Sequence, residues 1–148
     1  MKKVILLFVF ITSFAQAQSD YNLKKGAIAN GYDVVAYFNN KAEKGSKKYT
    51  TTYEGALFKF SSEKNLETFK KTPQKYIPQY GGYCAYAIGK TGEKVDINPK
   101  TFEIRNGKLY LFYSSWISSK LEDWKNGDTK KLQAQGDTNW EELKHKKK

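Results

Sequence analysis

The segment that decides the fold class is Phe102-Glu103-Ile104-Arg105-Asn106-Gly107-Lys108-Leu109-Tyr110-Leu111-Phe112-Tyr113. Two alternating, β-prone runs flank Asn106-Gly107, the dipeptide that type I′ hairpin turns favour. A second pair of β-prone runs, residues 47–53 and 56–60, is separated by Glu54-Gly55. The sequence therefore predicts two β-hairpins and an antiparallel sheet.

Helical patterns follow each predicted hairpin. The first helix is predicted to begin at a Ser61 or Ser62 cap and to stop before Pro73. A second is predicted to begin after Ser114 or Ser115, and a third after Asp128. The apolar residues that keep helical spacing in the second helix are Trp116, Ile117, Leu121 and Trp124.

The order of these elements indicates the fold class. Strands, a helix, a glycine-rich turn, a hairpin and two helices predict one small α+β domain whose antiparallel hairpins are packed by about three helices. Residues 32–38 are apolar and β-prone, which predicts a short strand or extended segment. No internal repeat is evident in the sequence.

The N-terminus has the pattern of a secretory signal peptide. Met1-Lys2-Lys3 is basic, residues 4–14 are apolar, and Ala15-Gln16-Ala17 is a small-residue cleavage site. We expect residues 1–17 to be removed and the mature protein to be periplasmic or extracellular. No later segment approaches the length of a transmembrane helix.

The mature chain divides into three parts by composition. Residues 18–30 are polar and aperiodic, which predicts a flexible lead-in whose Leu23 and Ile28 dock on the domain. Residues 31–143 form the predicted domain, and residues 144–148 form a basic tail.

The positive charge does not indicate a nucleic-acid partner. Lys and Arg number 26 against 15 Asp and Glu, a formal net charge of +11. Four of the lysines lie in the tail, and Arg105 is the only arginine, the residue that reads phosphates and guanines best. We therefore expect no nucleic-acid binding.

Several classes of site are excluded by residue counts. His145 is the only histidine, so Ser-His-Asp triads and histidine zinc sites are ruled out. No glycine-rich phosphate-binding motif is present. Cys84 is the only cysteine, so no intrachain disulfide can form.

Cys84 follows Gly81-Gly82 in the segment richest in aromatic residues and glycine. Its thiolate is a candidate metal ligand or reactive thiol, supported by oxygen donors such as Asp33, Asp96 or a tyrosine hydroxyl. The alternative is a small buried apolar residue among aromatic rings. The sequence leaves both interpretations open.

Tyrosines cluster around the same segment. They offer apolar faces with hydroxyl groups, which suits a ligand cleft, but buried tyrosines also serve as core residues. The tyrosines concerned are Tyr32, Tyr37, Tyr76, Tyr80, Tyr83 and Tyr86. The tryptophans at helical positions, Trp116, Trp124 and Trp140, are predicted to be core or helix-docking residues.

Five segments together resemble the exported YHS-domain proteins of bacteria over about residues 30–142. The segments are Gly31-Tyr32-Asp33-Val34-Val35-Ala36-Tyr37-Phe38, Tyr53-Glu54-Gly55-Ala56-Leu57-Phe58-Lys59-Phe60, Phe69 through Pro73-Gln74-Lys75-Tyr76, Tyr80-Gly81-Gly82-Tyr83-Cys84-Ala85 and Asn106-Gly107-Lys108-Leu109-Tyr110-Leu111.

The resemblance implies a metal-related role, because shorter YHS domains occur beside metal-handling modules, notably copper-transporting ATPases. Where those short domains have cysteines, this chain has Ala36, Ser61-Ser62 and Asn65. Cys84 is the one soft ligand that remains.

The leading hypothesis is an exported, non-enzymatic binding module of the YHS type. It would bind a metal ion, with copper or iron as candidates, or a metal-containing small ligand near Cys84, the expected metal ligand. The alternatives are a thiol-dependent enzyme or redox protein that uses Cys84, and a structural protein-interaction module. The expected ligand-binding residues are Tyr32, Asp33, Tyr37, Tyr80, Gly81, Gly82, Tyr83 and Tyr86.

Overall fold

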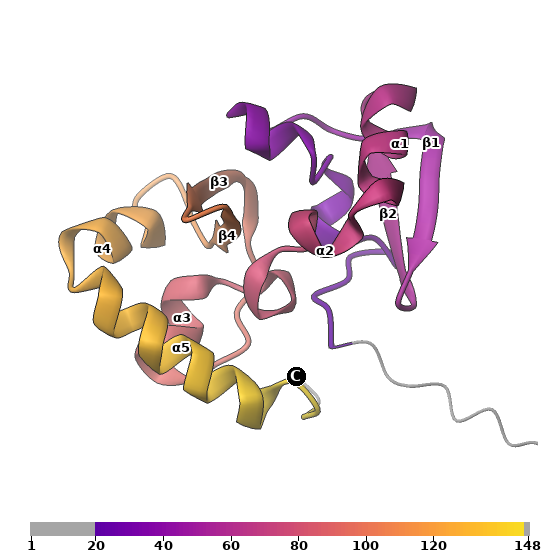
Figure 1. Ribbon diagram of the computed structural model, residues 1–148. Helices are drawn as coiled ribbons and strands as arrows, with labels where there is room; N and C mark the ends of the chain where they lie inside the picture. Colours follow the sequence, from indigo (N-terminus) through magenta and orange to yellow (C-terminus); the bar gives the residue numbers. More distant parts are fainter. Residues whose placement is uncertain (1–19, 147–148) are drawn as a thin grey trace, which may run out of the picture.

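Two antiparallel hairpins, each followed by helices, form the protein (Figure 1). A computed structural model describes residues 20–146. The first hairpin joins β1 (Ser46–Tyr53) to β2 (Ala56–Phe60), and α1 (Glu63–Lys71) packs against it. Glu54 and Gly55 of its turn have positive φ, 47° and 77°. The predicted hairpin and helix are confirmed.

The second hairpin joins β3 (Asn98–Arg105) to β4 (Lys108–Phe112). Asn106 and Gly107 both have positive φ, as the predicted type I′ turn requires. Helix α4 (Lys120–Asn126) follows, and α5 (Thr129–Leu143) begins at the predicted cap, where the Asp128 side chain accepts a hydrogen bond from the Lys131 amide.

Shorter elements connect these parts. They are the 3₁₀ turns η1 (Ile28–Gly31), η2 (Ala36–Asn39) and η3 (Gln79–Gly82) and the helices α2 (Pro73–Tyr76) and α3 (Ala85–Thr91). In the described part of the chain, no helix is both long and apolar enough to cross a bilayer. The predicted α+β class is confirmed, with two small two-stranded sheets.

One continuous apolar core joins the two hairpins. Phe69 of α1 packs on two aromatic rings of β2, and Trp124 of α4 packs on two aromatic rings of β4. The strand rings are Phe58 and Phe60 in the first hairpin and Tyr110 and Phe112 in the second. Tyr37 links the halves, with its ring centroid 4.7 Å from that of Phe102.

The two hairpins have the same register and the same irregularity. The first pairs Ser46↔Phe60, Thr50↔Lys59, Thr51↔Phe58, Thr52↔Leu57 and Tyr53↔Ala56. The second pairs Asn98↔Phe112, Phe102↔Leu111, Glu103↔Tyr110, Ile104↔Leu109 and Arg105↔Lys108. A constant residue offset relates every pair, and the bulge falls at the same place in each hairpin.

The turns that precede the hairpins repeat as well. Each contains three consecutive residues with positive φ, namely Ala29, Asn30 and Gly31 in the first and Tyr80, Gly81 and Gly82 in the second. Each is closed by a 3.0 Å backbone hydrogen bond, from Tyr32 to Ala29 and from Tyr83 to Tyr80. The prediction of no internal repeat was therefore wrong. Two structurally equivalent units are present: the first runs from η1 through the β1–β2 hairpin, and the second runs from η3 through the β3–β4 hairpin. The two units share few residue identities.

Two predicted elements differ from the structure. Residues 32–38 form no strand, because the Asp33 side chain accepts backbone N–H groups and folds the chain into η2. Trp116 and Ile117 lie in a loop before α4 and are 95% and 73% exposed. The prediction of Trp116 as a buried helical residue was therefore wrong.

Residues before Gly31 are part of the packed structure. Ala27, Ile28 and Ala29 are almost fully buried, and the Asn22 amide donates a 2.7 Å hydrogen bond to the Gly81 carbonyl. The ordered domain thus begins earlier in the chain than residue 31. The predicted signal peptide lies outside the described residues.

Asp33 ties three elements of the first unit together. One carboxylate oxygen accepts the amides of Val35 and Ala36 at 2.9 and 3.2 Å. The other accepts the Ser61 amide and hydroxyl, each at 2.8 Å, and the Asn65 side-chain amide at 2.7 Å. Because Asp33 is fully buried, these five donors replace the water that a carboxylate needs.

We predict that Asp33→Asn lowers the free energy of unfolding by about 3 kcal/mol. The side-chain NH₂ group of Asn would replace one of the two acceptor oxygens, so the buried N–H and O–H groups that face it would have no acceptor. Chemical denaturation measures the change. Asp123→Asn is the control, since Asp123 is partly exposed and pairs with Lys120, an interaction of below about 1 kcal/mol. Equal losses in both variants would contradict the assigned role of Asp33.

Candidate functional site

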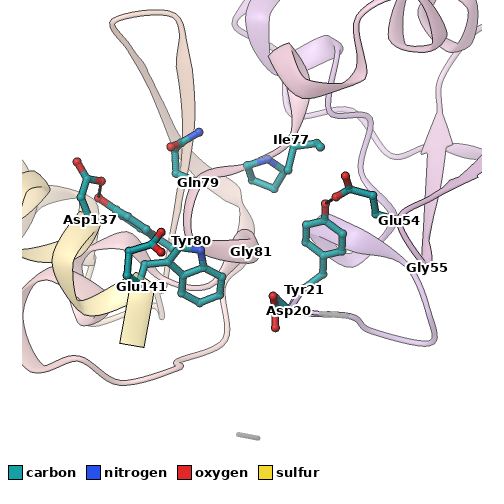
Figure 2. A pocket seen from close by; sticks show the side chains of 12 residues that line it. Asp20, Tyr21, Glu54, Gly55, Ile77, Gln79, Tyr80, Gly81, Asp137 and Glu141 are labelled. Carbon is teal, nitrogen blue, oxygen red and sulfur yellow. Dashed lines mark hydrogen bonds between the residues drawn. The ribbon is translucent and has the colours of Figure 1, made fainter. Parts of the chain in front are cut away.

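An open cleft of about 770 Å³ is lined by residues from several distant parts of the chain (Figure 2). Residues from the start of the described chain, the first hairpin turn, the segment joining the two units and α5 line it. They are Asp20, Tyr21, Glu54, Gly55, Ile77, Pro78, Gln79, Tyr80, Gly81, Asp137, Trp140 and Glu141. The cleft therefore lies where the two units meet.

One wall of the cleft belongs to the first unit. The Tyr21 hydroxyl donates a 2.5 Å hydrogen bond to the Glu54 carboxylate, and the Tyr21 ring packs edge-on against Phe58. Figure 2 shows this wall facing Tyr80, Asp137 and Glu141 across the hollow. Burial, together with Glu54, raises the pKa of Tyr21, so its hydroxyl stays a donor at neutral pH.

The opposite wall is held by Tyr80. Its hydroxyl donates to the Asp137 carboxylate at 3.0 Å and lies 3.3 Å from the Gln133 carbonyl, so it anchors η3 to α5. Gly136 leaves room for this contact, because a Cβ at that position would lie 2.7 Å from the Tyr80 hydroxyl. Burial, with a further contribution from Asp137, raises the pKa of Tyr80.

Gly81 allows two walls of the cleft, Asp20 and Trp140 of α5, to pack closely against the backbone at residue 81. Its φ is +59°, and a Cβ would lie 2.2 Å from the Asp20 carbonyl oxygen and 2.9 Å from the Trp140 ring. A side chain at this position would push both walls apart. Of the Gly81-Gly82 pair predicted as ligand-binding residues, Gly81 therefore builds the cleft by its lack of a side chain, whereas Gly82 does not line the cleft and packs against Ile28 and Pro78.

The predicted ligand-binding residues do not all gather at this cleft. Tyr80 and Gly81 line it, whereas Tyr83 and Tyr86 line two smaller, separate hollows. Tyr37 is fully buried and donates a 2.6 Å hydrogen bond to the Pro99 carbonyl. Asp33 is buried in its hydrogen-bond network. Tyr32 lines none of these three hollows.

Cys84 is fully buried and occupies the position in the second unit that Asp33 occupies in the first. The Asp33 amide donates to the Glu43 carbonyl at 2.8 Å, and the Cys84 amide donates to the Val95 carbonyl at 2.9 Å. Backbone groups of Tyr113, Ala87 and Tyr86 lower the pKa of the Cys84 thiol in part, although the thiol makes no capping hydrogen bond at the start of α3. These three residues are the counterparts of Ser61, Ala36 and Val35, which donate to Asp33.

The environment of Cys84 favours the neutral thiol. Burial raises its pKa, and the neighbouring backbone groups and the Lys120 ammonium only partly oppose that effect. A protonated, enclosed thiol reacts slowly with external reagents. The core interpretation of Cys84 therefore accounts for its burial, its partners and its pKa.

The positions at which the short YHS domains have cysteines lie, in this chain, around the Asp33 carboxylate. Ala36, Ser61 and Asn65 meet around Asp33 and donate to its carboxylate. Across residues 20–146, no group of three or more His, Cys, Asp or Glu side chains is placed to hold a metal ion.

Sequence reasoning missed most of the cleft. Tyr21, Glu54, Asp137 and Glu141 were not among the predicted site residues, and Trp140 was predicted to be a core or helix-docking residue. The one available signal was helical spacing, which places Asp137 and Glu141 on the same face of α5 as Trp140. No local sequence pattern indicates that this face of α5 and Tyr21 line the same cleft.

We predict that the native Cys84 thiol reacts with Ellman's reagent at least about a hundredfold more slowly than the denatured protein, since it becomes accessible only when the structure opens. A Cys84→Ser/Ser115→Cys double variant is the control, because Ser115 is exposed in the loop before α4. It should react quickly while folded. If Cys84 of the folded unchanged protein reacted with Ellman's reagent as fast as the cysteine introduced by Ser115→Cys in the folded double variant, Cys84 would be accessible and the prediction wrong.

Comparison with known proteins yields one result, a YHS domain. No curated protein and no solved structure matches the chain. The family model for the YHS domain matches residues 35–80. This segment runs from the η2 turn through the first hairpin and α1 to Tyr80, so a YHS domain occupies the first of the two equivalent units.

Proposed function

We propose that this chain is an exported, non-enzymatic binding module of the YHS type that holds a small ligand in the cleft between its two units. The observation that carries the proposal is the cleft itself. Its volume, about 770 Å³, lies in the usual range for small-molecule sites, and junctions between structural units are common places for them.

The walls of the cleft have a composition that suits a binding site. Aromatic rings from Tyr21, Tyr80 and Trp140 supply apolar area, while carboxylates and Gln79 supply polar contacts. Tyr80 is 4% exposed and is held at both its ring and its hydroxyl. A site whose side chains are fixed in advance loses little entropy when a ligand binds.

Export is supported by the N-terminal pattern of basic, apolar and small residues. Cleavage after Ala17 would keep Asp20 and Tyr21 in the mature protein, so the first wall of the cleft would remain intact.

We predict that Gln79→Trp, which places an indole in the cleft, abolishes ligand retention. The matched control is Gln135→Trp, because Gln135 is an exposed residue of α5 that lines a different, smaller hollow. Each protein is incubated with the small-molecule fraction of the producing cells, washed and denatured, and the released compounds are identified by mass spectrometry.

We expect the unchanged protein and Gln135→Trp to retain the same compound and Gln79→Trp to lose it. If all three proteins release the same set of compounds, or none, the cleft does not hold a ligand and the proposal fails.

A metal ion at Cys84 is the second candidate function. It is favoured by the YHS domain at residues 35–80, which ends shortly before Cys84 in the sequence. Elemental analysis after incubation with copper or iron tests it. If this candidate is right, the protein binds the metal stoichiometrically and Cys84→Ser loses it while Gln79→Trp retains it; equal metal contents in the unchanged protein and Cys84→Ser would exclude it.

A further inference from the structure

We infer that the ligand of this cleft is a small organic cation, and specifically one with more than one ammonium group, such as a linear diamine or polyamine. The inference rests on the proposed function, because it names the chemical class that the same cleft accepts.

The first observation is the sign of the charge that lines the cleft. The lining contains four carboxylates, Asp20, Glu54, Asp137 and Glu141, and no lysine, arginine or histidine. The whole chain, by contrast, has 26 Lys and Arg and a formal net charge of +11. Carboxylates that line a cleft attract cations and disfavour carboxylate and phosphate ligands.

Two of the carboxylates have spare hydrogen-bonding capacity. Glu54 accepts the Tyr21 hydroxyl through one oxygen, and Asp137 accepts the Tyr80 hydroxyl through one oxygen. Neither has a lysine, arginine or histidine partner among the described residues. Because a carboxylate accepts several hydrogen bonds, the second oxygen of each remains able to accept an ammonium group.

The other two carboxylates already have partners in the chain. Glu141 accepts Lys144 at 2.6 Å, and Asp20 lies 3.4 Å from the His145 ring nitrogen. The Glu141–Lys144 pair shows that an ammonium group associates with this end of α5. They leave Glu54 and Asp137 as the two carboxylates for an external cation.

The aromatic lining fits the same class of ligand. Tyrosine and tryptophan rings attract cations over their faces. Trp140 already does so inside the protein, since the Lys94 ammonium lies 5.5 Å from its ring centroid. An alkylammonium ligand combines a charge for the carboxylates with methylene groups that pack on these rings.

The placement of the carboxylates favours more than one charge in the ligand. Glu54 belongs to the first hairpin and Asp137 to α5, and Figure 2 shows them on opposite sides of the hollow. A chain with an ammonium group at each end contacts both walls at once, whereas a single small cation contacts one. This arrangement makes a linear diamine or polyamine the ligand class that satisfies both carboxylates.

Calorimetric titration of the full chain with spermidine tests this inference. The variants are Glu54→Gln and Asp137→Asn, which keep an oxygen for the tyrosine hydroxyl but remove the charge, and the double variant. Glu122→Gln is the matched control, because Glu122 is an exposed acid of α4 outside the cleft. Circular dichroism confirms that each variant is folded.

We expect one spermidine per chain and a loss of affinity of about tenfold in each single variant, with a larger loss in the double variant. Glu122→Gln should bind like the unchanged protein, and Gln79→Trp should not bind. Equal affinity in the double variant and the unchanged protein would overturn the inference, since spermidine would then be bound elsewhere.

Titrations with glutarate and with glycerol separate the two proposals. Suppose that glutarate or glycerol binds, that Gln79→Trp abolishes this binding, and that spermidine does not bind. The cleft is then a ligand site, but the inference of a cationic ligand is wrong. If spermidine does not bind and Gln79→Trp retains the same compounds as the unchanged protein, both proposals fail.

Discussion

The structure depends on one acceptor side chain placed at the start of each unit. In the first unit, Asp33 collects the amides that begin η2 and the donors that begin α1, so one buried carboxylate sets the angle between them. A buried carboxylate is tolerated only when its oxygens are fully hydrogen-bonded. In the second unit Cys84 takes this place and is equally buried, but its thiol makes no capping hydrogen bond to α3. The first unit has a carboxylate, a strong hydrogen-bond acceptor, before the short 3₁₀ turn η2, whereas the second has a thiol, a weak acceptor, before the helix α3. A regular helix depends less on side-chain hydrogen bonds than a single 3₁₀ turn does.

The elements that depend on local signals could be predicted from the sequence. Asn106-Gly107 forces a tight turn with positive φ, and Asp128 and Ser62 cap helices through their own side chains, so α5, α1 and both hairpins follow from neighbouring residues. Segment 32–38 could not be predicted, because its β-branched and aromatic residues favour a strand while the distant Ser61 and Asn65 complete the network that bends it. Trp116 has the right spacing for a helix, but α4 begins later, at Lys120.

Neither the two equivalent units nor the cleft could be predicted from the sequence, because neither depends on a local sequence pattern. The two units agree in backbone geometry, positive φ and register, which many residue types can satisfy, rather than in side chains. The cleft arises only where the units meet, so its residues come from four distant parts of the chain. Cys84, the residue that sequence chemistry singled out, is buried in the core, while the carboxylates of Glu54 and Asp137, which have no distinctive sequence context, line the cleft.

The enclosure of Cys84 has a consequence for a protein that is exported as we propose. Disulfides persist in such compartments, and a free thiol there is open to exchange with the disulfides of neighbouring proteins. Exchange requires a thiolate that can reach the other sulfur. Cys84 is fully buried and its pKa is raised, so the folded chain keeps an unpaired cysteine without forming mixed disulfides or covalent dimers.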